Sequence, residues 1–313
     1  MKRVAGLLLA VAAFAAAVAG CGLGAGQGSG DVTITVSRDF GDSSLEPPKT
    51  EAVKDETVME LLQRSFDDVH TRFGGGFVQT IDGVSGGMEA GRRVDWFYYV
   101  NGIEAQQGAA QRKVYGGDRI WWDHHDWQVA MRIPAVVGSF PEPFLDGSEG
   151  RKIPVKLVCV GAIGRSCDEV EQRLMDAKVK AVSRSSLPQS IGRETLRIVV
   201  GRWRDIRLDP AAALLEKGPG ASGVYARPQP SGRSIALLDA RGKVASTLGP
   251  GGGLIAATRF DDQEPTWFVT GTDEVGVASA AAALIEDSLR DRFALAIEAG
   301  RGVPLPVKLE AGP

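Results

Sequence analysis

Residues Trp96-Phe97-Tyr98-Tyr99-Val100-Asn101-Gly102-Ile103-Glu104-Ala105 carry the clearest fold signal in the chain. Aromatic and β-branched residues favour a strand, and Asn-Gly between two such runs indicates a two-residue hairpin turn. Because side chains alternate along a strand, both faces of this strand are aromatic. One face can meet a helix of the same domain. The other face needs a different partner, for which the C-terminal half of the chain is the nearest candidate.

Flanking segments predict a small domain around this hairpin. The expected strands cover residues 31–37, 77–81, 96–100 and 119–122. After the first strand, apolar residues recur at helical spacing from Val58 to Val69, behind Asp55 or Thr57 as the N-cap. One helix on a mixed sheet of four or five strands is a β-grasp-like order. We therefore expect a β-grasp-like N-terminal domain over residues 31–131.

A Pro-rich connector over residues 132–152 leads to a second domain over residues 153–313. There, strand patterns alternate with helical ones, which is typical of an α/β sandwich with some parallel pairing. The expected strands are 155–160, 196–201, 235–239 and 266–270, and the expected helices are 168–179, 210–216 and a long Ala-rich helix over 277–293. Ala-rich segments 211–216 and 281–286 follow two of these strands at an offset of 70 residues, which an internal βα duplication or chance would explain.

The first twenty residues have the pattern of a signal peptide, because Lys2 and Arg3 precede an uncharged apolar run. The following Val18-Ala19-Gly20-Cys21 resembles the lipobox of bacterial lipoproteins, which implies cleavage before Cys21 and acylation of its thiol. Residues 21–30 would then be a Gly-rich tether. We expect an extracytoplasmic lipoprotein anchored to the bacterial cell membrane; ordinary secretion and a retained anchor are the alternatives.

Export changes the interpretation of the two remaining cysteines. With Cys21 acylated, Cys159 and Cys167 form an even pair in an oxidising compartment. We predict a disulfide between them, with two buried free thiols as the alternative. The short loop that such a bridge closes would stabilise the fold by about 2.5 kcal/mol in the chain-entropy model.

Four pieces of the N-terminal domain follow one another in an order known from other proteins. They are Thr57-Val58-Met59-Glu60-Leu61-Leu62, Ile81-Asp82-Gly83-Val84, Trp96-Phe97-Tyr98-Tyr99-Val100-Asn101-Gly102 and Gly117-Asp118-Arg119-Ile120-Trp121-Trp122. This order resembles the transcobalamin-like C-terminal domain, a domain-of-unknown-function family frequent in bacterial surface lipoproteins, over about residues 31–127. In transcobalamin and intrinsic factor, the equivalent domain closes over cobalamin, so the resemblance implies a corrinoid ligand. Cobalamin binding there needs a helical partner domain, and residues 132–313 resemble none.

Aromatic residues gather in the N-terminal domain, as sheet core or as a platform for a planar ligand. The candidate ligand-binding residues are Trp96, Tyr98, Tyr99, Asn101, Trp121, Trp122, His124, His125 and Trp127. Metal-competent side chains occur in Asp123-His124-His125-Asp126, but alternation along a strand divides them between two faces. We therefore predict no metal site there, and expect a solvated strand end.

A second candidate site lies where a strand runs into the Ala-rich helix. Its residues are Thr270, Gly271, Thr272 and Asp273. Free backbone N–H groups at the start of that helix would receive an anion or another ligand. Capping of the helix by Thr272 or Asp273 is the alternative.

Composition limits the function. Lys+Arg 36 against Asp+Glu 39 gives a net charge of −3, which excludes a polybasic nucleic-acid binder. With 3 Cys and 3 His, the chain has few residues for nucleophilic or His-based catalysis. We therefore predict a non-enzymatic module without a cofactor that binds an unknown small molecule, in its sharper form for a membrane transporter. The alternatives are a structural or protein-interaction component of the cell envelope and a corrinoid-binding surface protein.

Overall fold

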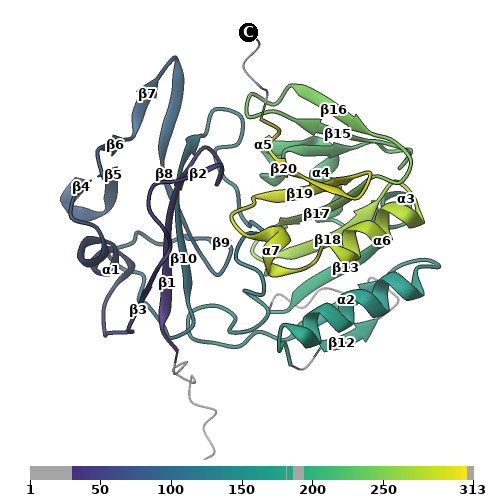
Figure 1. Ribbon diagram of the computed structural model, residues 1–313, viewed down its shortest axis with the longest axis horizontal. Coiled ribbons are helices and arrows are strands. Elements are labelled where there is room, and N and C mark those ends of the chain that lie inside the picture. Colours follow the sequence, from purple (N-terminus) through teal and green to yellow (C-terminus); the bar gives the residue numbers. More distant parts are fainter. Residues whose placement is uncertain (1–29, 181, 186–193, 309–313) are drawn as a thin grey trace, which may run out of the picture.

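The structure, a computed structural model, describes residues 30–180, 182–185 and 194–308 and is a mixed α+β fold built mainly from sheets (Figure 1). Two seven-stranded sheets and two three-stranded sheets make up its strands. The predicted signal peptide, Cys21 and the tether lie outside the described residues. No helix within the described ranges has the length and apolar character to cross a membrane.

The N-terminal sheet has the strand order β2-β1-β10-β8-β7, with β3 paired to β1 and β9 paired to β8. Its strands are β1 (Val32–Arg38), β2 (Ser43–Ser44), β3 (Lys49–Glu51), β7 (Gly87–Glu89), β8 (Arg92–Val100), β9 (Ile103–Glu104) and β10 (Arg119–Asp126). β1 and β10 are parallel, and the other pairs are antiparallel. At the predicted hairpin, Asn101 and Gly102 have φ values of 56° and 75°, as this turn requires.

One helix, α1 (Val58–Ser65), packs on one face of this sheet. Thr57 caps it, and Glu60 completes a capping box. The helix is shorter than expected, because Val69 belongs to β4 (Val69–Arg72). β4 forms a small sheet with β5 (Phe77–Ile81) and β6 (Val84–Ser85), and the one-turn η1 (Phe73–Gly75) joins β4 to β5.

The second large sheet has the order β12-β11-β13-β18-β17-β19-β20. Its strands are β11 (Val155–Cys159), β12 (Val182–Ser185), β13 (Leu196–Arg202), β17 (Gly253–Thr258), β18 (Thr266–Gly271), β19 (Ala294–Glu298) and β20 (Arg301–Leu305). Pairing is parallel from β12 to β18 and antiparallel from β18 to β20. The predicted parallel pairing is therefore present, but only in half of the sheet.

Different elements cover the two faces of the second sheet (Figure 1). One face packs against the helices α2 (Gly164–Asp176), α6 (Glu274–Ala282) and α7 (Glu286–Leu289). The other face packs against α3 (Trp203–Ile206), α4 (Ala212–Lys217), α5 (Pro219–Ser222) and a small sheet of β14 (Ala226–Pro228), β15 (Ile235–Leu238) and β16 (Val244–Leu248).

A single apolar cluster, here called the shared core, joins the two large sheets. It combines Phe40, Tyr99 and Trp121 from the N-terminal sheet with residues of the C-terminal half, among them Trp203, Tyr225, Phe268 and Phe293. The second aromatic face of β8 thus packs where the sequence predicted, against the C-terminal half of the chain. Residues 132–152 add buried side chains to the cores, including Val136 and Phe140.

One expectation for the C-terminal half is wrong, and the two Ala-rich segments prove to differ. The long helix over 277–293 is two short helices, α6 and α7, and the chain then enters β19. The two Ala-rich segments are not equivalent, since 212–217 is the helix α4 whereas 281–286 runs from the end of α6 through a turn into α7. Moreover, α4 and α6 pack in different cores, so only the parallel strands β13 and β18 correspond. Alanine favours helix without setting where a helix ends, which explains why one long helix was expected.

Candidate functional site

The aromatic candidates form packed cores rather than an open platform. Trp96, Tyr98 and Trp122 lie in the core beneath α1, and the Tyr98 and Trp122 rings stack with centroids 4.7 Å apart. Tyr99 and Trp121 lie in the shared core. Because all five side chains are buried, none of them offers a free ring face to a ligand.

The two remaining candidates of this group have structural partners. Asn101 is buried; its amide donates to Asp118 Oδ1 and to the Gly147 carbonyl, at 3.1 and 2.9 Å. Trp127 is half-buried and donates through Nε1 to Asp95 Oδ2 at 2.8 Å. Both side chains therefore fasten the sheet to neighbouring segments.

The segment 123–126 is buried, so the expected solvated strand end is wrong. The alternation is as predicted: His124 faces Trp96 and lies 3.1 Å from the Ser85 carbonyl, whereas His125 points to the shared core. Burial lowers the pKa of His124. No group of three His, Cys, Asp or Glu side chains suited to a metal ion occurs within the described ranges.

Asp123 has a fully buried carboxylate with four donors around it. Oδ1 accepts from Phe40 N at 3.0 Å and lies 2.8 Å from His125 Nδ1. Oδ2 accepts from Gly41 N at 2.9 Å and from Ser37 Oγ at 2.5 Å. This carboxylate thereby holds the turn that follows β1 against β10, and it places the Phe40 ring between the two halves of the chain.

In the predicted anion loop, residues 270–273, the polar groups form hydrogen bonds with neighbouring backbone. Thr270 is buried and donates to the Gly201 carbonyl at 2.7 Å. Asp273 accepts from Gly276 N and Gly251 N, at 2.9 and 2.8 Å, and Thr272 donates to the Gly249 carbonyl at 2.8 Å. Because the Asp273 carboxylate already accepts from the first turn of α6, the hydrogen bonds seen here are those of a helix cap, the alternative to an anion site.

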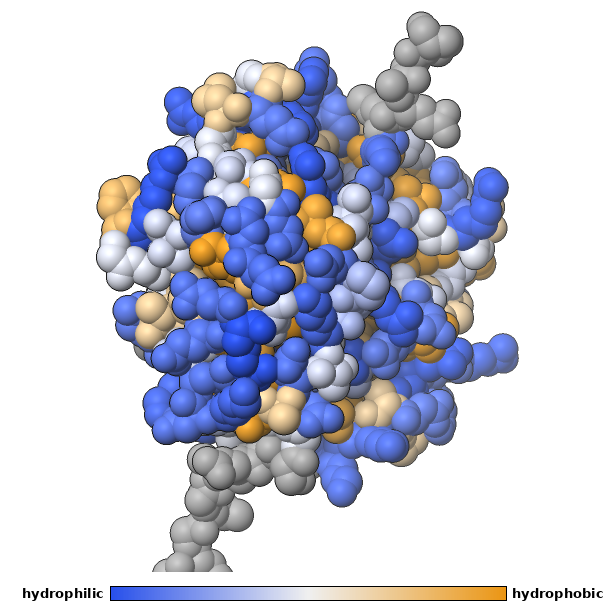
Figure 2. Space-filling view, turned by 60° about the vertical axis from the view of Figure 1, so that its left-hand side comes forward, coloured by the Kyte–Doolittle hydropathy of each residue, from blue (hydrophilic) through white to orange (hydrophobic). Residues whose placement is uncertain are grey.

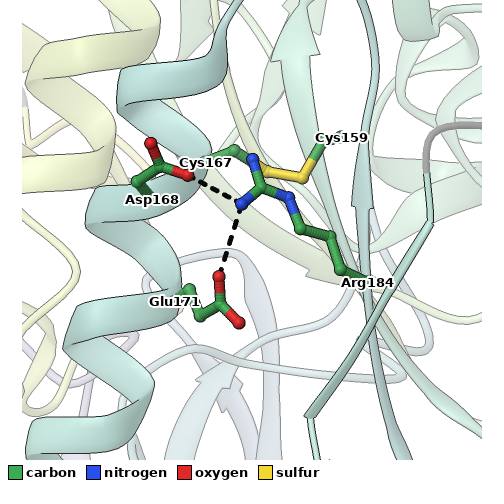
Figure 3. The surroundings of a disulfide bond; sticks show 5 residues. All are labelled: Cys159, Cys167, Asp168, Glu171 and Arg184. Atoms are coloured by element: carbon green, nitrogen blue, oxygen red, sulfur yellow. Dashed lines mark hydrogen bonds and ion pairs between the residues drawn. A yellow bond between two sulfur atoms is a disulfide. The ribbon is translucent and has the colours of Figure 1, made fainter.

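The predicted disulfide joins Cys159 at the end of β11 to Cys167 in α2. Beside it, Arg184 of β12 points toward α2 and pairs with Asp168 and Glu171, at 2.7 and 3.4 Å (Figure 3). The bridge and the ion pairs fasten α2 to the edge of the second sheet.

A groove of about 680 Å³ opens where the N-terminal sheet meets the C-terminal half. One wall is the turn after β1 together with the start of β8. The other walls are the turn between β15 and β16, the loop before β19, and the chain from β20 to Lys308. The lining residues are Asp39, Phe40, Asp42, Arg92, Asp239, Ala240, Arg241, Lys243, Arg292, Val303, Pro304, Leu305, Pro306, Val307 and Lys308.

Two ion pairs lie along this groove. Lys308 Nζ is 2.6 Å from Asp42 Oδ2, and this pair connects the chain after β20 to the turn after β1. Arg92 lies 3.5 Å from Asp39 on the same wall. Asp239 is engaged by its own turn, where Oδ1 accepts from the backbone N–H groups of Arg241 and Lys243. All three lining carboxylates are therefore in use.

This groove was not predicted from the sequence. Its lining comes from segments that start near residue 39 and end at residue 308, so no local spacing marks it. The sole local signal was the turn Asp239-Ala240-Arg241-Gly242-Lys243, which carries two cations after a buried strand.

On the face of the molecule that Figure 2 shows, hydrophilic residues predominate and hydrophobic ones form small separate groups.

Comparison with protein families supports part of the resemblance predicted for the N-terminal domain. Residues 55–126 match a family model described as a domain of unknown function (DUF4430), a shorter stretch than the expected 31–127. No curated protein matches the sequence.

Several solved structures are similar to this chain, and two of them are described here. One is a Ruminococcus gnavus protein provisionally described as metal binding, at 20% identity and a TM-score of 0.26, covering 31% of this chain and 97% of that one. The other is haptocorrin in complex with Cbi, at 18% identity and a TM-score of 0.24, covering 32% of this chain and 26% of that one.

Proposed function

We propose that this protein is a non-enzymatic binding module that takes a small solute into the groove between its two halves. The groove itself is the observation that carries this proposal, since its volume of about 680 Å³ lies in the range usual for small-molecule sites, roughly 300–1,000 Å³. Its lining mixes aliphatic residues with a few charged ones, as such sites commonly do.

Close backbone contacts support a preformed groove. Gly41 has a φ of 77°, and a Cβ there would overlap the Asp291 carbonyl; Gly138 leaves room for Trp121 and the backbone of Arg292. The loop that carries Arg292 is therefore seated directly on the N-terminal sheet. A groove whose walls are already in contact loses little entropy on binding, which favours affinity.

The lining residues also support a binding role over catalysis. Within the part of the chain that the structure describes, they include no His, Cys or Ser. They supply cations, carboxylates and aliphatic surface, which suit recognition better than nucleophilic or His-based chemistry.

We also propose where the protein lies in the cell and how its chain is divided. Acylated Cys21 would anchor the protein outside the cytoplasmic membrane, where captured solute could pass to a transporter. Residues 31–131 would form a β-grasp-like unit, and residues 153–313 an α/β unit. A structural role in the envelope is the second candidate, favoured by the shared core, which buries apolar residues of both halves at their junction.

A neutral apolar dye tests the groove. We expect N-phenyl-1-naphthylamine to bind with a fluorescence increase, and Ala240→Trp to abolish this signal by filling the groove. Ala278→Trp, at an exposed position of α6, is the matched control and should bind as the native protein does. Acyl chains are the same in every variant, so differences between variants report the groove. Equal dye binding by both variants, or none by the native protein, would favour the structural role.

Acylation and corrinoid binding need tests of their own. Radioactive fatty acid should label the native protein and not Cys21→Ala; equal label in both would refute the anchor. Spectral titration with a corrinoid tests the third candidate, and the absence of a shift at micromolar concentration would remove it.

A further inference from the structure

We infer that the groove selects organic anions that carry an apolar body, an inference that rests on the proposed binding function and specifies its ligand class. The charges of the lining residues carry it, together with their partners. Five of these residues are cations and three are carboxylates, so the groove has a positive excess. The whole chain has the opposite balance, with a net charge of −3.

Among the residues described by the structure, three of the five lining cations have no carboxylate partner, and they account for the positive charge of the groove. Arg92 and Lys308 have carboxylate partners in Asp39 and Asp42. Within the described residues, Arg241, Lys243 and Arg292 form no ion pair. These three come from two walls, the turn between β15 and β16 and the loop before β19, and all of them face one groove.

The burial of Arg292 makes its charge the most significant of the three. Arg241 and Lys243 are exposed, whereas Arg292 is half-buried. A cation removed from water gains more from an anionic partner than an exposed one, because screening is weaker there. Its sequence neighbour Asp291 lines a different cavity, and burial raises the pKa of that carboxyl while Arg292 and Arg290 lower it.

Apolar residues complete the site and narrow the ligand class. Ala240 lies on the wall that carries Arg241 and Lys243, and Val303 and Val307, which are half-buried like Ala240, add aliphatic surface from the chain after β19. An inorganic anion would leave this surface in water, and a neutral apolar molecule would leave the three cations without a partner. A carboxylate, sulfonate or phosphate ester joined to a hydrophobic group satisfies both.

Two dyes of nearly the same shape separate charge from apolar contact. The sulfonate 8-anilinonaphthalene-1-sulfonate carries the same ring system as the neutral N-phenyl-1-naphthylamine. At low salt we expect the native protein to bind the sulfonate at least about tenfold more tightly, a ratio that falls as salt rises. The double variant Lys243→Gln with Arg292→Gln should weaken the sulfonate about tenfold and leave the neutral dye within about twofold.

Lys217→Gln, an exposed cation outside the groove, is the control and should change neither affinity. If the native protein binds both dyes equally, or if the double variant weakens both equally, anion selection is wrong while the groove stands. If neither dye binds the native protein, the proposed binding function fails as well. Circular dichroism of the double variant shows whether the fold is intact.

Discussion

His125 Nδ1 lies 2.8 Å from Asp123 Oδ1, and the imidazole is held between the rings of Phe40 and Phe97, at 4.7 and 4.5 Å. This pair sits in the interface of the two halves, next to Phe293. A polar pair at this position orients one sheet on the other, whereas apolar contacts alone would tolerate sliding.

Replacing Asp123 by Asn tests this arrangement. The amide keeps one acceptor oxygen but turns a donor toward the backbone N–H of Phe40 or Gly41, which leaves a buried donor without a partner. We expect Asp123→Asn to lower the free energy of unfolding by about 2–4 kcal/mol. Urea denaturation measures the loss, and Asp67→Asn, at an exposed position, should cost less than about 0.5 kcal/mol.

The close approach at Gly41 predicts a difference between two glycines of similar backbone conformation. Gly41 and Gly83 have φ values of 77° and 76°, but only at Gly41 would a Cβ meet other atoms, the Asp291 carbonyl among them. Gly83→Ala should cost about 1 kcal/mol through strain. Gly41→Ala should cost at least about 2 kcal/mol more, because the Asp291 loop must move. Thermal unfolding compares the two, and equal losses would contradict this packing.

A buried glutamate predicts how stability depends on pH. Burial raises the pKa of Glu142 to about 8, and Asp146 and Asp118 add to the effect while Arg119 and a hydrogen bond from Asp146 N oppose it. Between the ordinary value of 4.5 and about 8, the folded protein holds a proton that the unfolded chain releases, so stability falls as pH rises through this range.

Glu142→Gln should remove this dependence, because the amide resembles the protonated acid. We expect the fall in unfolding free energy between pH 5 and pH 8 to be smaller in this variant by roughly 3 kcal/mol. Urea midpoints at both pH values provide the measurement. Exposed Glu149→Gln should leave the fall unchanged, and an unaltered fall in Glu142→Gln would show that Glu142 is ionised in the folded state.

We expect reduction of the disulfide to lower the stability of the protein. Opening Cys159–Cys167 should lower the unfolding free energy by about 2.5 kcal/mol. Denaturation with and without dithiothreitol measures it. The double variant Cys159→Ala with Cys167→Ala should be as stable as the reduced protein, and dithiothreitol should not change its stability. If dithiothreitol leaves the stability of the native protein unchanged, the disulfide does not stabilise the fold.

Local signals were sufficient for much of the N-terminal half. The Asn101–Gly102 turn is set by neighbouring residues and occurs as predicted, and of the two N-cap candidates, Asp55 and Thr57, the structure has Thr57. The β17, β19 and β20 strands were missed. Ala294 to Ile297 continues an Ala-rich pattern, and pairing with β17 on one side and with β20 on the other distinguishes it from helix.

The candidate site was even harder to predict from the sequence than the strands, because it too depends on contacts between distant segments. The aromatic and His candidates were chosen from composition, and burial then placed nearly all of them in cores. Burial of Asp123 depends on four donors, two of them backbone N–H groups, and no side-chain pattern reports those. The cations of the groove come from separate segments, and their lack of partners is visible only once all the neighbours are in place.

The shared core has a consequence for how the chain can be divided. Separating residues 31–131 from the remainder would expose Tyr99 and Trp121 on one piece and Phe293 on the other, so neither piece would retain a finished interior. The two halves should therefore melt in one cooperative transition with a single calorimetric peak. For the same reason, gain or loss of either half during evolution would require a new apolar partner for the face left behind.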